Sequence, residues 1–151
     1  MSMLKVGDRL PEFILNDQDN VPFDVKSVLG KPLVIFFYPK DNSPGCTAQV
    51  CSFRDQFEVF QDYGAELIGI SFDSTKSHKS FSKRYRLPFK LLSDPRRKVQ
   101  KLFGISKTTF GISYSRVTFV VDREATIVKV FSNTVLATAH IRASLNALKL
   151  L

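Results

Sequence analysis

The chain alternates between short apolar runs and longer stretches in which apolar residues return every three or four positions. Residues 33–38 form a continuous apolar run of strand length, which is typical of a strand buried on both faces of a sheet, and residues 65–72 (AELIGISF) predict a second buried strand. Between them, from Cys46 to Phe60, the apolar residues have helical spacing, and Gly64 follows as the stop. This order predicts a strand, a helix and a second strand, and the two strands of such a unit are normally parallel.

Polar residues with capping character mark the next helix. Asp73 and Ser74 are expected to cap it, Phe81 and Tyr85 mark its buried face, and residues 87–88 end it with a proline.

The following stretch predicts a short extended segment at residues 89–92 and one more short helix. Asp94 and Pro95 are expected to start that helix, and Gly104 is expected to end it. Three of its residues are expected to face the core, namely Val99, Leu102 and Phe103. Residues 105–115 show little pattern and are expected to form a loop.

The two ends of the chain are expected to complete the sheet and cover it. Residues 13–15 and 21–25 predict an N-terminal β-hairpin, and residues 117–121 and 126–131 predict an antiparallel pair. Residues 137–150 have the spacing of an amphipathic helix. The sequence therefore predicts an α/β fold with a mixed central β-sheet flanked by helices.

Composition narrows the class of protein. The chain has 151 residues, of which 44% are hydrophobic, enough to bury the core of one domain spanning residues 1–151. No run approaches the roughly 20 apolar residues of a membrane span, and no early stretch resembles a signal peptide. Two cysteines are too few for a secreted disulfide framework. We therefore expect a cytoplasmic protein without a membrane partner, whose cysteines have a redox role.

The net charge of +8 raises the question of a nucleic-acid partner, because basic residues concentrate between positions 76 and 101. They are spread over two amphipathic segments, and no zinc-finger or helix-turn-helix signature accompanies them. We interpret them as solvated helix faces and expect no nucleic-acid partner. The charge can still steer an acidic protein partner.

Cys46 lies where the first buried strand, a turn-forming cluster at residues 41–45 and the predicted helix meet. The first turn of a helix has unpaired N–H groups, which stabilise negative charge. A thiol with a pKa of about 8.5 is only ~3% ionised at pH 7, and about 3 kcal/mol from a helix N-terminus and a nearby cation would ionise most of it. Cys46 is therefore a candidate nucleophile; the alternative is a small buried hydrophobic residue.

The residues around Cys46 resemble a known family. In PKDNSPGC, Pro39, Ser43 and Cys46 resemble the Pro, Thr or Ser, and Cys pattern of the peroxiredoxins, thiol peroxidases of the thioredoxin superfamily. The second cysteine in CTAQVC resembles the peroxiredoxin Q (bacterioferritin comigratory protein) branch, and the likeness continues through IGISFDSTKSHKSF, LPFKLLSDP, FGIS and SRVTFVVD. Two departures are Ser43, where Thr is commoner, and Ala125, where a turn glycine is usual.

This resemblance implies a thioredoxin-like fold and a peroxidase mechanism without a cofactor or metal. Cys46 would attack a hydroperoxide and become a sulfenic acid, and Cys51 would resolve it to a disulfide that a thioredoxin-type protein reduces. Pro39 would shield the site, the Ser43 hydroxyl would bind the peroxide, and Arg116 would supply the positive charge. The branch it resembles includes monomers and dimers, so we expect a monomer or weak dimer.

Several alternatives stay open from the residues themselves. Arg116 could be an ordinary basic residue at a strand edge, and Cys51 a packing residue in a one-cysteine peroxidase. A zinc site of Cys46, Cys51, His78 and His140 is possible by count, although we expect each histidine on a polar helix face. A thiol–disulfide oxidoreductase normally has two residues between its cysteines, and here there are four. A catalytically silent thioredoxin-like binding module is the main alternative to an enzyme.

The spacing of the two cysteines has a geometric consequence. Five residues along a helix correspond to about 7.5 Å of rise and roughly 140° of rotation. A disulfide needs Cα atoms within about 6.8 Å. If Cys46 and Cys51 pair, the start of the helix must therefore unwind.

Overall fold

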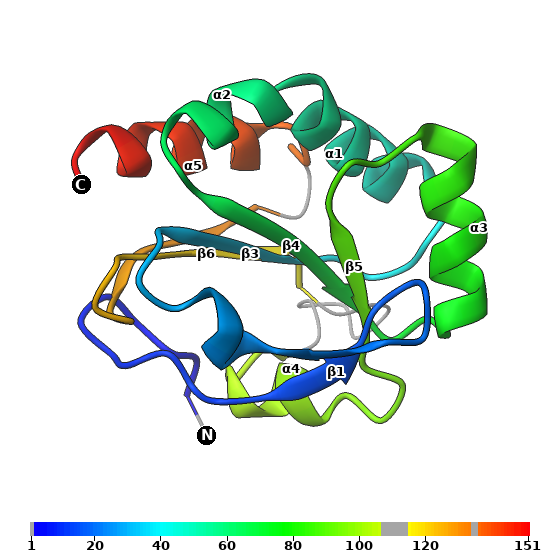
Figure 1. The fold of residues 1–151 in the computed structure, drawn as a ribbon, viewed down its shortest axis with the longest axis horizontal. Coiled ribbons are helices and arrows are strands. Elements are labelled where there is room, and N and C mark those ends of the chain that lie inside the picture. Colours follow the sequence, from blue (N-terminus) through cyan, green and yellow to red (C-terminus); the bar gives the residue numbers. More distant parts are fainter. Residues whose placement is uncertain (1, 107–114, 134–135) are drawn as a thin grey trace.

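The computed structural model describes residues 2–106, 115–133 and 136–151, and its centre is a mixed seven-stranded sheet (Figure 1). The strand order is β2-β1-β5-β4-β3-β6-β7. The strands are β1 Ile14–Asn16, β2 Pro22–Asp24, β3 Leu33–Phe37, β4 Glu66–Ser71, β5 Lys90–Ser93, β6 Val117–Val121 and β7 Ile127–Ser132. The helices are the 3-10 helix η1 Val25–Val28 and the α-helices α1 Pro44–Asp55, α2 Phe57–Asp62, α3 Thr75–Tyr85, α4 Lys98–Leu102 and α5 Ala139–Lys149.

Strand β3 is an inner strand of the sheet, between β4 and β6, and all five of its residues are buried. It pairs in parallel with β4, which pairs in parallel with β5, whereas β6 runs antiparallel to β3 on its other side. The predicted strand, helix and parallel strand are therefore confirmed, as is the mixed sheet. A strand buried on both faces needs cover on both sides, and the helices provide it.

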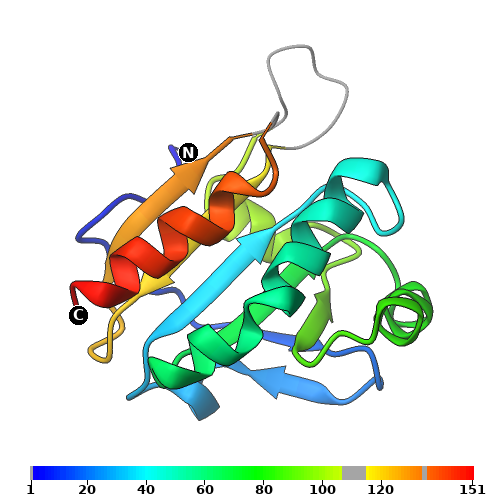
Figure 2. The ribbon, with the colours of Figure 1, turned by 90° about the horizontal axis from the view of Figure 1, so that it is seen from above.

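Alternate side chains of β3 enter two separate cores. Val34 and Phe36 pack under α1, α2 and α5, which share one face of the sheet (Figure 2). Ile35 and Phe37 point to the opposite face, where α4 lies (Figures 1 and 2). The two-residue period of a strand produces this division, because successive side chains leave the sheet in opposite directions.

An aromatic stack fixes α1 to the sheet. The ring of Phe36 stacks on that of Phe53 in α1, with 4.4 Å between centroids. Gly69 in β4 leaves room for it, since a Cβ there would lie 2.6 Å from the Phe36 ring. The helix that begins beside Cys46 is thereby held against the centre of the sheet.

The single helix predicted from Cys46 to Gly64 is wrong in its continuity. Gln56 adopts φ −104° and ψ 10° between α1 and α2, while its N–H still donates to the carbonyl of Ser52 at 3.2 Å. The chain kinks there and resumes helical bonding, so the helical spacing of apolar residues continues across the break. Gly64 follows α2 with φ 71°, a left-handed backbone conformation that glycine adopts readily, so the predicted stop at Gly64 is confirmed.

Helix α4 differs from its prediction at its start, whereas Gly104 follows its last turn with φ 74°, as expected. The helix begins at Lys98, because Arg97 has a left-handed backbone with φ 54°. Asp94 still serves the helix start, since its carboxylate accepts the N–H groups of Val99 and Gln100 at 3.3 and 2.9 Å. A helix of five residues buries only a narrow face, so Leu102 is 40% exposed instead of facing the core.

The remaining elements agree with the sequence. The hairpin of β1 and β2 joins the sheet through the pairing of Asn16 with Ser93, and β6 pairs with β7 around Ala125, which has φ 63°. Helix α5 lies within the predicted range. Helix α3 begins after its Ser74 cap, as expected. Of the predicted loop at 105–115, positions 107–114 lie outside the described residues.

Candidate active site

Cys46 lies in the first turn of α1, as predicted. Ser43 is the N-cap, Pro44 is the first helical residue, and Cys46 follows two positions later with a fully buried side chain. The Ser43 hydroxyl accepts the N–H of Cys46 at 3.4 Å and donates to the carbonyl of Lys40 at 3.1 Å. Since 3.4 Å is long for an N–H to oxygen distance, the N–H of Cys46 forms only a weak hydrogen bond with Ser43.

Sheet pairing brings Arg116 to this helix start. Val117, the first residue of β6, pairs with Phe37, the last residue of β3, so the residue before β6 lies where the chain leaves β3 for α1. Arg116 is 6% exposed, and its Nη1 donates to Cys46 Sγ at 3.2 Å. A buried, permanently charged guanidinium at this distance stabilises negative charge on the sulfur.

Gln49 completes the contact and was missed by sequence reasoning. Its Oε1 accepts the same Nη1 of Arg116 at 2.8 Å, and its side chain is fully buried. The available signal was spacing, because a residue three positions after Cys46 shares its helix face. Two N–H groups of this pair, Arg116 Nε and Gln49 Nε2, are buried without an acceptor among the described residues.

Cys51 lies in α1, five residues after Cys46, and Pro39 lies in the loop between β3 and α1. Both cysteines are free thiols within one intact α1, and Cys51 is half-buried. Burial raises the pKa of the Cys51 thiol, against the opposing effect of Arg54 one turn later. Pro39 is half-buried in the loop after β3.

The two histidines correct the expectation of polar helix faces, because both are fully buried. The Nδ1 of His140 accepts the Thr118 hydroxyl at 2.8 Å, and its Nε2–H donates to the Asn133 carbonyl at 2.9 Å. Burial lowers the pKa of His140 to about 4, and the charge of Arg116 acts in the same direction. His140 is therefore neutral at pH 7.

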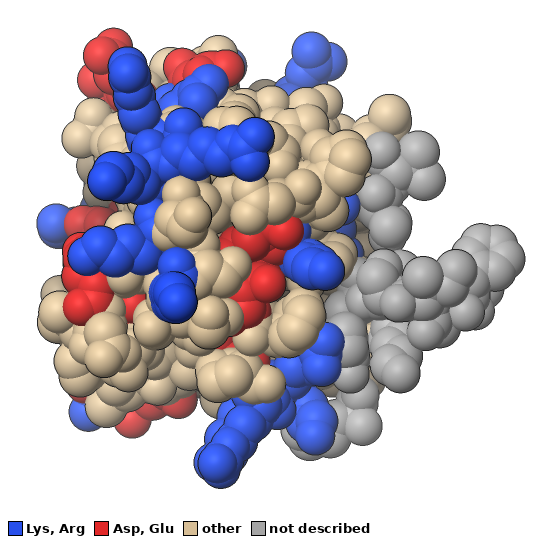
Figure 3. All heavy atoms as spheres, turned by 90° about the vertical axis from the view of Figure 1, so that its right-hand side faces the viewer, with Lys and Arg blue, Asp and Glu red and all other residues tan. Residues whose placement is uncertain are grey.

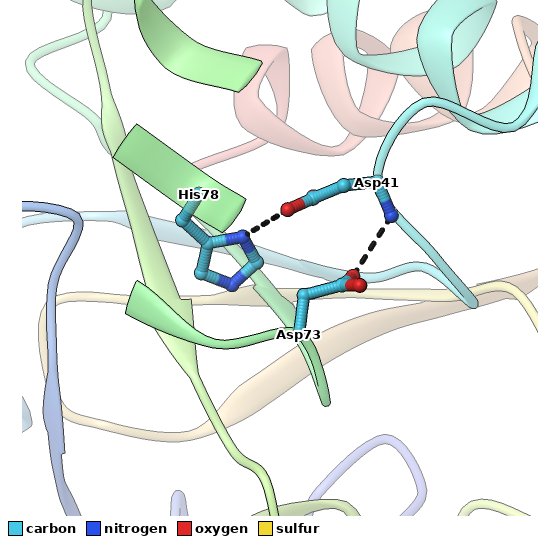
Figure 4. Close-up of side chains that lie close together, drawn as sticks. All are labelled: Asp41, Asp73 and His78. Carbon is cyan, nitrogen blue, oxygen red and sulfur yellow. Dashed lines mark hydrogen bonds and ion pairs between the residues drawn. The ribbon is translucent and has the colours of Figure 1, made fainter. Parts of the chain in front are cut away.

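His78 forms a polar cluster with the buried Asp41 and the half-buried Asp73 (Figure 4). One potential ligand atom from each of the three lies within 4.8 Å of the others, which is close enough for a metal ion. The cluster is already closed by hydrogen bonds, including 2.7 Å from His78 Nδ1 to Asp41 and 2.8 Å from the Asp41 N–H to Asp73. The alternative zinc set of two cysteines and two histidines is not assembled among the described residues, where the metal-sized cluster is that of Asp41, Asp73 and His78.

Basic side chains spread over the face that carries α3, around a smaller acidic area (Figure 3). Lys79 pairs there with Asp19 at 3.3 Å, and both side chains are well exposed. Such pairs contribute little to stability. Among the described residues, no helix is both long and apolar enough to cross a membrane.

The chain is similar in sequence and fold to several known proteins. The model of the AhpC/TSA family matches residues 6–130. The chloroplastic peroxiredoxin Q of Sedum lineare is 44% identical over 143 residues, covering 95% of this chain and 77% of that protein. The peroxidoxin BcpB of Mycobacterium tuberculosis has a TM-score of 0.90 at 33% identity, covering 98% of both chains. Peroxiredoxin Q of Xanthomonas campestris has a TM-score of 0.82 at 30% identity, covering 91% and 90%. The fold is thus the thioredoxin-like fold of these structures.

The buried His140 generates a prediction about pH and stability. Its pKa is about 4 in the folded state, below the ordinary histidine pKa of 6.5 that it has in the unfolded chain, so protons bind more tightly to the unfolded chain. Its contribution is complete above pH 6.5 and is lost as pH falls towards 4. Between pH 7 and pH 5, urea unfolding of the wild type should lose about 2 kcal/mol more than that of His140→Gln. Equal losses in the two proteins would contradict this assignment.

Proposed function

Since the chain belongs to the AhpC/TSA family of thiol-dependent peroxidases, we propose that Cys46 is its peroxidatic residue and reduces hydrogen peroxide and organic hydroperoxides. The observation that carries the proposal is the 3.2 Å contact between Arg116 Nη1 and Cys46 Sγ at the start of α1. This contact favours an enzyme over a silent binding module, because a protein that only binds partners gains nothing from a cation buried against a thiol.

The reaction is a two-electron oxidation of sulfur. The Cys46 thiolate attacks the terminal oxygen of the hydroperoxide, so that an S–O bond forms as the O–O bond breaks. The other oxygen leaves with the bonding pair and takes up a proton, giving water from hydrogen peroxide or an alcohol from an organic hydroperoxide. Cys46 is left as a sulfenic acid.

The surrounding groups fit the charge that develops on the oxygens. Arg116 donates to the sulfur through Nη1. Its Nε–H and the Nε2–H of Gln49 have no acceptor among the described residues, and each would gain one from a peroxide oxygen. A buried donor without an acceptor costs about 1 to 3 kcal/mol, so ligand binding recovers that cost. Ser43 already donates to Lys40, so it would accept a hydrogen bond from the peroxide O–H. Pro39 would limit the entry of water.

Resolution by Cys51 is the second part of the proposal. Its thiol condenses with the Cys46 sulfenic acid, forming the S–S bond and releasing water. Both residues lie in the intact α1, so its first turns must unwind and draw the buried Val50 and Phe53 from their packing. Unwinding also removes the burial that raises the pKa of Cys51, so the resolving thiol becomes a better nucleophile when it is needed.

We further propose that a thioredoxin-type dithiol protein reduces this disulfide, and that the enzyme acts in the cytoplasm as a monomer or weak dimer. No cofactor or metal enters the proposed chemistry.

Cys46→Ser is the experiment that tests the function. It should abolish peroxide consumption, because a serine hydroxyl is neither ionised nor nucleophilic enough to break the O–O bond. Turnover should be measured with hydrogen peroxide, thioredoxin, thioredoxin reductase and NADPH. Retention of more than a few per cent of the rate would remove Cys46 from this role.

Arg116→Ala should slow oxidation of Cys46 by about 100-fold or more, because it removes charge stabilisation of the size that one oxyanion-hole donor provides. Stopped-flow measurement of the single-turnover rate checks this. Arg123→Ala, at an exposed residue of the turn after β6, is the matched control and should react like the wild type. A rate for Arg116→Ala within threefold of wild type would show that the contact has no catalytic role.

Cys51→Ser should leave the first oxidation intact but allow the sulfenic acid to proceed to sulfinic acid under excess peroxide. In the wild type, hydrogen exchange of residues 46–53 should be faster in the oxidised form, because the pairing unwinds α1. Mass spectrometry measures both. Equal protection in the two redox forms, or an oxidised wild type without an internal disulfide, would rule out this resolution step.

A further inference from the structure

The buried cluster around His78 holds the loop that leads to the reacting sulfur (Figure 4). Asp41 belongs to the loop between β3 and α1, two residues after Pro39 and two before Ser43. Its two chain neighbours are exposed, yet Asp41 itself is only 4% exposed. The loop thus turns one charged side chain inward, directly between two residues of the proposed site.

Asp41 ties this loop to its surroundings through both its carboxylate and its backbone. Its Oδ1 accepts the Tyr38 hydroxyl at 2.6 Å, and its Oδ2 accepts the Ser77 hydroxyl at 2.8 Å and lies 2.7 Å from His78 Nδ1. Its N–H donates to Asp73 Oδ2 at 2.8 Å. These partners come from the end of β3, the first turn of α3 and the segment after β4, so the loop is bound at the carboxyl ends of neighbouring parallel strands.

Both ring nitrogens of His78 are held by hydrogen bonds. Its Nε2 lies 3.0 Å from the Leu92 carbonyl, which can only accept, so Nε2 carries a hydrogen. Its Nδ1 lies 2.7 Å from Asp41 Oδ2, so one hydrogen is shared between these two atoms. Asp41 also accepts hydroxyl hydrogens from Tyr38 and Ser77. The side chains of His78 and Asp41 are thus joined by a short hydrogen bond at 0% and 1% exposure.

We propose that Asp41 and His78 are positioning residues for the peroxide reaction, an inference that rests on the peroxidase function proposed above. Their hydrogen bonds reach the loop, α3 and β5, and they act on the reaction by holding Pro39 and Ser43 in place beside Cys46. A displacement of about 1 Å in such groups can cost a factor of 100 in rate. The pair also keeps the loop fixed while α1 unwinds, because none of its bonds involves α1.

His78→Gln is the principal test, because glutamine retains an N–H for the Leu92 carbonyl but lacks the second ring nitrogen that bonds to Asp41. The single-turnover rate with hydrogen peroxide should fall by roughly 10- to 100-fold. Alkylation of Cys46 by iodoacetamide, measured in the Cys51→Ser background, should change by less than twofold. The two reactions should separate because the contact between Arg116 and Cys46 comes from β6 and α1 and does not depend on the loop.

Two comparisons distinguish positioning from general loss of stability. Leu148→Ala removes a buried side chain of α5 and should lower the unfolding free energy while leaving both rates within twofold of wild type. Asp41→Asn should resemble His78→Gln. The double variant should be no more than threefold slower than the slower single variant, because both changes break one pair.

Three results would overturn the inference. The first is a peroxide rate for His78→Gln within threefold of wild type. The second is an equal fall of the peroxide rate and the alkylation rate in His78→Gln. The third is a peroxide rate for Leu148→Ala that falls as far as that of His78→Gln. If His78→Gln does not fold, the same rate criterion applies to Ser77→Ala, which removes one hydroxyl bond to Asp41 and leaves the contact between Asp41 and His78 in place. An inactive wild type would instead contradict the peroxidase function itself, so the two failures are distinguishable.

Discussion

The buried guanidinium of Arg116 is the constraint on which the site depends. Taking a cation out of water costs several kcal/mol unless nearby groups compensate it. Among the described residues, the hydrogen bonds of Arg116 go to Gln49 and Cys46, and neither is a carboxylate. In the proposed reaction, negative charge on the Cys46 sulfur would compensate the guanidinium. The neutral His140 adds no second positive charge.

Placing such a cation requires the sheet. Arg116 lies 70 residues after Cys46, and only the antiparallel pairing of β6 with β3 brings it to the start of α1. The stack of Phe36 on Phe53 then fixes the distance of α1 from the same strand. Both the pairing with β6 and the stack on Phe53 are made by residues of β3, a strand that is buried throughout its length. The core thus sets the position of the reacting atoms as well as the stability of the fold.

In the proposed cycle, the site combines a firmly held loop with a helix that unwinds at its start. Asp41 and His78 bind the loop to α3 and β5, whereas the start of α1 is capped by Ser43 through a long hydrogen bond. In the proposed cycle the first part stays in place and the second unwinds to bring Cys51 to Cys46. This division lets one short segment serve both the attack on peroxide and the formation of the disulfide.

The sequence by itself determined the strands, most helices and the place of Cys46, because periodic burial and turn residues are local signals. Its resemblance to a family also pointed to Arg116, which is found beside Cys46. It failed at the kink of Gln56 and at the start of α4, where a single backbone conformation decides the outcome.

Only the tertiary structure decided the surroundings of the polar residues. His78 has lysine and serine neighbours in the chain, so its helix face looked solvated, yet its partner Asp41 is 37 residues away. The burial of Gln49 and His140 was not predicted for the same reason, because their partners Arg116 and Thr118 are also distant in the chain. A polar side chain is buried when distant groups satisfy its hydrogen bonds, and no local pattern of hydrophobicity records those partners.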